Sequence, residues 1–218
     1  MDAETIIAIP SMDMVPMLFA QSLATLDKPG PTAIATQINS LVYAARNALA
    51  TQAIERGAKR IFWLDSDMLF PSGTLKHLSN VLEEQGDKVI LSGLYCKRTP
   101  PYNPVLLDKL EFDEEGTCIH HWLEEVPDEI FEVKGCGFGC VLAPVDAFRE
   151  VMVEFGDMFT PINGTGEDLS FCWRARQLGW KILCDPRIMI GHYAHTVVTR
   201  SYWEDYKAFQ TQEGMKNV

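Results

Sequence analysis

A short apolar run that ends in two aspartates constrains the fold of this chain more than any other feature. The five residues Arg60 to Leu64 are bulky and mostly apolar, which is typical of a strand buried on both faces of a parallel sheet. The run breaks at Asp65, Ser66 and Asp67. Open α/β sheets bind ligands beyond the carboxyl ends of their strands, so we expect both carboxylates at a ligand-binding edge.

The spacing of the two aspartates predicts a metal site. Asp65 and Asp67 flank a single residue, and two ionised carboxylates this close repel each other unless a cation lies nearby. A hard divalent cation would relieve that repulsion and keep coordination positions open for phosphate oxygens. The competing interpretation is a surface turn, because Asp and Ser are common turn residues. The pair alone does not decide between these two interpretations.

The segments on either side of this run predict an α/β fold. Thr5 to Ile9 is β-branched and apolar, which predicts a first buried strand that ends at Pro10 and Ser11. Further strands are predicted at residues 88–92 and 180–184, and helices at 14–26, 38–56, 73–85 and 145–155. With 218 residues, the chain has the length of a single domain. We expect a mostly parallel twisted sheet flanked by helices.

The charge of the chain excludes one class of partner. Its net charge is -11, whereas a general nucleic-acid binder needs a basic face. Such an acidic protein needs a metal to bridge it to a phosphorylated ligand. No window approaches the length of apolar sequence that spans a membrane, and we expect no signal peptide. The six cysteines are scattered without a Cys-x-x-Cys pair, so we expect reduced thiols in a cytoplasmic protein.

The predicted helix at 38–56 carries two polar residues of interest. Its apolar stripe consists of Ile38, Leu41, Ala45, Leu49 and Ala53. Arg46 and Asn47 lie on the same predicted helix, between Ala45 and Leu49 of the stripe. Their spacing alone favours solvated side chains for both.

A glycine-rich stretch is the second unusual feature. Residues 131–143 read as one strand in which Gly135, Gly137 and Gly139 alternate and so face the same side. Glycine in a strand often marks the close approach of a ligand or of another backbone, and both readings stay open here. The Gly-x-Gly-x-x-Gly spacing of a dinucleotide site is absent.

Two more stretches supply charged residues. Gly166 is followed by Glu167 and Asp168, which open a predicted helix where acidic side chains suit the helix dipole. Simple helix capping explains one of these acids better than the pair. The loop after residue 92 carries Lys97 and Arg98, which could bind a diphosphate or form a solvated loop tip. Residues 110–128 predict a strand pair at the sheet edge, with His120 and His121 as surface residues.

The chain resembles the GT-A glycosyltransferases, especially the family 2 nucleotide-sugar transferases. Four short motifs occur in it in the same order as in that family. They are Pro10-Ser11 after the first strand, Ala45-Arg46-Asn47 on a helix, Leu64-Asp65-Ser66-Asp67, and Gly166-Glu167-Asp168 before a helix that ends in Leu-Gly. Ile190-Gly191-His192 is similar to the C-terminal metal-ligand histidine of several GT-A enzymes. The first strand lacks the usual Pro-x-Tyr/Phe-Asn, and the acceptor motif and membrane helices of processive synthases are absent.

This resemblance implies a single GT-A domain over residues 1–218. Residues 1–95 would form the nucleotide and metal half, residues 96–200 the acceptor half, and residues 201–218 a C-terminal helix or tail. The implied activity is metal-dependent transfer of a sugar from a nucleoside-diphosphate sugar to an acceptor hydroxyl, with inversion favoured over the retention of other relatives.

The resemblance also implies roles for single residues. Asp65, Asp67 and His192 would bind Mn²⁺ or Mg²⁺, with His195 as the rival of His192. Asp168 would be the catalytic base and Glu167 would orient the acceptor. The donor nucleotide sugar would contact Pro10, Ser11, Arg46, Asn47, Asp65 and Gly137.

Two other classes stay open. A metal-dependent nucleotidyltransferase would also use paired aspartates, but it usually shows a basic glycine-rich loop after its first strand. A non-catalytic nucleotide- or sugar-binding module would use Asp168 only as a helix cap. The acceptor of a transferase could be a glycan, a protein, a lipid, a modified nucleic-acid base or a small molecule.

Overall fold

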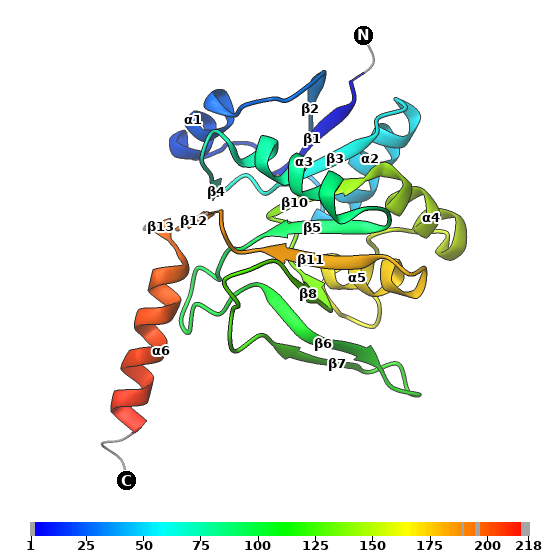
Figure 1. Cartoon of the computed structure of the whole chain (residues 1–218). Coiled ribbons are helices and arrows are strands. Elements are labelled where there is room, and N and C mark those ends of the chain that lie inside the picture. Colours follow the sequence, from blue (N-terminus) through cyan, green and yellow to red (C-terminus); the bar gives the residue numbers. More distant parts are fainter. Residues whose placement is uncertain (1–2, 189, 195–196, 215–218) are drawn as a thin grey trace.

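A seven-stranded sheet forms the centre of the molecule in the computed structural model, which describes residues 3–188, 190–194 and 197–214 (Figure 1). Its strands, in spatial order, are β2 (Thr32–Ile38), β1 (Thr5–Ser11), β3 (Arg60–Leu64), β10 (Cys140–Pro144), β5 (Val89–Gly93), β11 (Lys181–Asp185) and β8 (Phe131–Val133). Strands β2, β1, β3, β5 and β11 run in one direction, and β10 and β8 oppose them. The expected mostly parallel sheet is therefore confirmed.

Helices cover both faces of this sheet because its strands are apolar on both sides. Ile6 and Trp63 pack into one core cluster with α2 (Val42–Glu55), α4 (Val145–Phe155) and α5 (Glu167–Gln177). The alternate residues Ile7 and Phe62 pack into a second cluster with α1 (Met17–Thr25) and α3 (Thr74–Gln85). Side chains alternate across a strand, so each central strand contributes to both layers.

Two small sheets border the central one. The first joins β4 (Met68–Leu69), β12 (Gly191–Tyr193) and β13 (Val197–Val198), and pairs His192 with Met68. The second joins β6 (Leu106–Phe112), β7 (Cys118–Trp122) and β9 (Gly135–Cys136). The last helix, α6 (Arg200–Gly214), projects from the body of the molecule (Figure 1). These additions bring His192 to the end of β3 and build a surface beside α6.

Several sequence predictions are confirmed, among them β1, β3, α3, β5, α4 and β11. The strand pair predicted at 110–128 exists as β6–β7, but it spans 106–122 and belongs to a separate small sheet instead of the edge of the central one. The predicted helix at 38–56 was wrong at its start, because residues 32–38 form edge strand β2 and the helix begins at Val42. Ile38 and Leu41 are therefore 50% and 66% exposed instead of lying on the core stripe. All six cysteines are free thiols, as expected.

The glycine-rich stretch is not the single strand that alternation suggested. It divides into β8, β9 and β10, which pair with β11, with β6, and with β3 and β5 respectively. Arg174 in α5 is buried despite its charge. It is 8% exposed, and its guanidinium donates to the carbonyl oxygens of Met158 and Thr160.

Within the described ranges, no helix combines the length and the apolar character needed to cross a membrane.

Candidate active site

Eight of the ten predicted site residues line one pocket of about 420 Å³ at the carboxyl ends of β1 and β3. They are Pro10, Ser11, Arg46, Asp65, Asp67, Glu167, Asp168 and His192. Parallel pairing of β1 with β3 places Pro10 and Asp65 at the same edge of the sheet. Helix α5 directs its first residues to this edge, and β12 supplies the histidine. The pocket therefore unites residues from both halves of the sequence.

Arg46 is the buried centre of this pocket. Its side chain is 2% exposed, Nη2 lies 2.8 Å from Oδ1 of Asp65, and Nε lies 3.2 Å from Oε1 of Glu167. Burial would lower the pKa of Arg46, but the charges of Asp65, Glu167 and Asp168 outweigh it and raise the pKa. The solvated side chain favoured by spacing alone was thus wrong for Arg46. The guanidinium instead contacts both the loop after β3, through Asp65, and the start of α5, through Glu167.

Asp67 faces two cationic or potentially cationic groups. Nη1 of Arg98 donates to its Oδ2 at 2.9 Å, and Nε2 of His192 lies 3.5 Å from the same oxygen. Burial would raise the pKa of Asp67, but the interaction with His192 and the charge of Arg98 lower it. The ionised carboxylate is therefore the favoured form.

The hydrogen bonding of His192 suits a metal ligand. Nδ1 lies 2.8 Å from the carbonyl oxygen of Cys96, and a carbonyl can only accept, so Nδ1 donates. In the neutral imidazole Nε2 then presents a lone pair to the carboxylate of Asp67, whereas in the imidazolium Nε2 donates to that carboxylate and lowers its pKa. A proton on Nε2, or a metal cation that replaces it between the two groups, stabilises the pair. In metal sites, the ring nitrogen of histidine that does not bind the metal usually donates to a carbonyl or a carboxylate, as Nδ1 does here.

The predicted three-residue metal centre is assembled only in part. Over residues 3–188, 190–194 and 197–214, no three His, Cys, Asp or Glu side chains converge as a ready ligand set. Asp67 and His192 lie together, whereas the carboxylate of Asp65 is turned toward Arg46. The rival ligand His195 lies outside the described residues. The donor set thus fits a divalent cation that takes its remaining ligands from phosphate and water.

Asp168 differs from the other carboxylates of the pocket. Burial, followed by the neighbouring charge of Glu167, raises the pKa of Asp168 to about 7, although the charge of Arg46 opposes the shift. Oδ1 accepts the backbone N–H of Leu169 at 2.8 Å, at the start of α5. The carboxyl therefore titrates in the pH range where a group can exchange protons with a substrate.

Two predicted donor contacts lie elsewhere. The side-chain amide of Asn47 donates to Asp157, and its oxygen accepts the N–H of Phe159, so Asn47 braces the segment after α4. A side chain at Gly137 would collide with the hydroxyl of Tyr95 and with Val105. Protein fills the space that we had assigned to a ligand, so Gly137 is required for packing.

Sequence reasoning left out Tyr95 and did not decide the role of Arg98. Tyr95 is 5% exposed, accepts the N–H of Gly139 through its hydroxyl, and contacts the ring of His192 edge-on. A bulky residue that packs against glycines distant in sequence leaves no local signal. Arg98 lines the pocket, whereas its neighbour Lys97 places its ammonium over the ring of Trp122.

Comparison with known proteins supports the fold of the chain but assigns it to no family. No protein-family model matches the chain, and no curated protein matches it. Among solved structures, the chain is similar to the crystal structure of A197 from STIV, with a TM-score of 0.61 and 17% identity. The match covers 90% of this chain and 93% of that one. It supports the mixed α/β fold, with its mostly parallel central sheet between helices, over nearly the whole sequence.

Proposed function

We propose that the chain is a metal-dependent glycosyltransferase of GT-A type that moves a sugar from a nucleoside-diphosphate sugar to an acceptor hydroxyl. One observation carries the proposal. A single pocket at the carboxyl ends of β1 and β3 holds a carboxylate–histidine pair suited to a cation and a separate carboxyl whose pKa is about 7. The first feature suits a diphosphate ligand, and the second suits proton transfer.

The residues around Asp67 would hold the diphosphate end of the donor. Mn²⁺ or Mg²⁺ on Asp67 and His192 would supply charge neutralisation for the departing diphosphate. Arg98 is 53% exposed and borders the same pocket, so its guanidinium is free to turn from Asp67 to a phosphate oxygen. Asp65, held by Arg46, would contact the ribose or a metal-bound water.

Two buried polar atoms also favour a polar ligand here. Oγ of Ser11 and Nη1 of Arg46 have no hydrogen-bond partner within the described part of the chain. Both residues line the pocket. Buried polar groups are normally paired, so an internal water, or a ligand oxygen admitted by a small movement of the side chains, would complete the pairing.

Asp168 would act on the acceptor. Its carboxylate would accept the proton of the acceptor hydroxyl as that oxygen attacks the anomeric carbon. The bond from the anomeric carbon to the phosphate oxygen breaks, and its electron pair leaves with the nucleoside diphosphate. Attack from the side opposite the leaving group inverts the anomeric carbon. Glu167 is fixed by Arg46 and would orient the acceptor.

A panel of nucleotide sugars incubated with the chain and Mn²⁺ tests this function. We expect at least one donor to release nucleoside diphosphate, slowly to water and faster with an acceptor. Release should stop when a chelator removes the metal. Release of pyrophosphate from a nucleoside triphosphate would instead indicate a nucleotidyltransferase, and binding of donor without any release would indicate a non-catalytic module.

A further inference from the structure

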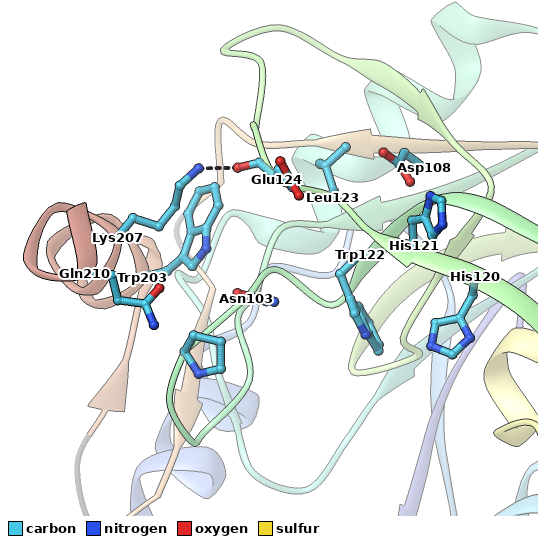
Figure 2. Close-up of a pocket in the computed structure, with 11 residues that line it drawn as sticks. Asn103, Asp108, His120, His121, Trp122, Leu123, Glu124, Trp203, Lys207 and Gln210 are labelled. Carbon is cyan, nitrogen blue, oxygen red and sulfur yellow. Dashed lines mark hydrogen bonds between the residues drawn. The ribbon is translucent and has the colours of Figure 1, made fainter. Parts of the chain in front are cut away.

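A second cavity lies apart from the candidate active site. It has a volume of about 640 Å³ and lies between hairpin β6–β7, the loop at 101–103 and α6 (Figure 2). Its lining shares no residue with the pocket around Asp67. Asp108 and His121 lie at one end, and Lys207, Trp203 and Gln210 lie at the other (Figure 2). The volume falls within the range of small-molecule sites, about 300–1,000 Å³.

The lining combines an aromatic surface with planar polar groups. Trp122 is partly exposed and lines the cavity, and Trp203, 4% exposed, closes it from the side of α6. The ammonium of Lys97, which does not line the cavity, lies over the ring of Trp122. Residues with carboxylate, amide and imidazole groups also line the cavity, namely Asn103, Asp108, His120, His121, Glu124 and Gln210.

The charge of the lining selects against anions. Asp108 and Glu124 are acidic, and the one lysine of the lining, Lys207, donates its ammonium to the carbonyl oxygen of Glu124 (Figure 2). The same ammonium lies 4.7 Å from the centre of the Trp203 ring. A phosphate or a nucleic-acid backbone would therefore meet net negative charge. A neutral polyol suits the cavity, since its hydroxyls pair with carboxylates and amides and its C–H face packs on an aromatic ring.

One loop connects this cavity with the candidate active site. The N–H of Lys97 donates to the carbonyl oxygen of Asn103 at 2.9 Å, which closes the loop between them. Arg98 in this loop contacts Asp67, whereas Asn103 lines the second cavity. The ring of Tyr102 packs edge-on against two tyrosines of α6. The loop thus borders both sites and packs against α6 between them.

We propose that the cavity between β6–β7 and α6 binds a neutral oligosaccharide, and that this glycan belongs to the acceptor. The first half of the proposal stands on the cavity alone. The second half rests on the proposed glycosyltransferase function and narrows its acceptor to a glycan.

Glycan binding by the cavity is tested with an array of neutral glycans. The array is probed with the full chain, without metal or nucleotide. The glycan that binds best is then titrated while the indole N–H signals of the tryptophans are followed by NMR. We expect the signal of Trp122 to shift. Asp108→Ala and Trp122→Leu should each raise the Kd about tenfold. Glu111→Ala is the matched control, because Glu111 is exposed on the same strand as Asp108 but does not line the cavity.

The outcomes separate the two halves. If no neutral glycan binds, or if Asp108→Ala and Glu111→Ala have the same effect, the cavity assignment is overturned. Asp108 is exposed, so its variant keeps the test decisive even where Trp122→Leu does not fold. If the glycan binds but no nucleotide sugar is consumed, the cavity assignment stands and the transferase function fails. If sugar is transferred but the array glycan is never the acceptor, the acceptor half fails.

Discussion

Replacement of Asp168 by Asn separates a catalytic base from a helix cap. The amide keeps the shape of the carboxyl and still accepts the N–H of Leu169, so the start of α5 should be preserved. It cannot take a proton at neutral pH. We expect turnover to fall by ~10²–10⁴, the usual contribution of a positioned base, while donor and metal affinity stay near wild type.

The same change should stabilise the fold at alkaline pH. The pKa of Asp168 is about 7 in the folded chain, against an ordinary value of 3.8. As pH rises from 4 to 7 the unfolded chain loses this proton and the folded chain keeps it, so the free energy of unfolding falls. A pKa shift of this size lowers the free energy of unfolding by at most about 4 kcal/mol. The side chain is partly exposed, so we expect a loss of about 2 kcal/mol. Because the amide of Asn does not titrate, the Asp168→Asn variant should not lose stability as the pH rises.

Two assays check both effects. Release of nucleoside diphosphate gives the turnover, and chemical denaturation without metal at pH 4 and pH 8 gives the stability. The variant should equal wild type at pH 4 and exceed it at pH 8. Glu167→Gln is the control, since it breaks an ion pair with Arg46 and should lower stability, with a smaller loss of turnover. An Asp168→Asn variant that keeps more than about a third of wild-type turnover would refute the assignment of the base.

Four further substitutions test the remaining assignments. Asp67→Ala should abolish the Mn²⁺ dependence of nucleoside-diphosphate binding in calorimetry. Arg98→Ala should instead strengthen Mn²⁺ binding without nucleotide, because the guanidinium no longer occupies Oδ2, and weaken nucleoside-diphosphate binding; unchanged values for both ligands would contradict these roles. Arg46→Leu should cost about 3–5 kcal/mol in denaturation, since it leaves Asp65 without its buried counter-charge; a loss below 1 kcal/mol would show that the pair is not coupled. Gly137→Val should lower stability by about 1–3 kcal/mol by overpacking, with binding retained in the folded fraction; a normal melting temperature with lost binding would restore the ligand interpretation.

The parts of the fold that local patterns determine could be predicted from the sequence. Apolar runs gave β1, β3 and β5, and helix periodicity gave α3 and α4 within a few residues. Strand β2 escaped prediction because it is an edge strand, where exposed and partly buried residues mix without clear alternation. The glycine-rich stretch was misread because alternation describes one strand, whereas this segment changes partner twice.

The site divides in the same way. Asp65 and Asp67 follow a strand and could be placed at the ligand edge from their position alone, whereas position marked Asp168 only as a helix-opening acid and the resemblance placed it in the site. The burial of Arg46 could not be predicted, because it depends on Glu167, 121 residues away in the sequence. Asn47 shows the opposite failure. It adjoins Arg46 in sequence, yet a helix turns consecutive side chains by about 100°, so its amide points to the segment after α4.

The distribution of cations around the four carboxylates explains why one of them suits proton transfer. Asp65 and Glu167 share the guanidinium of Arg46, and Asp67 contacts Arg98. Asp168 forms no ion pair with any residue that the structure describes, and it adjoins the charge of Glu167. Each of these three carboxylates has a cationic partner, which suits a ligand for a cation, a ribose or an acceptor. Asp168 lacks such a partner among the described residues, and burial raises its pKa to about 7. Environments that separate the pKa values of neighbouring acids are the usual means by which one site assigns them different roles.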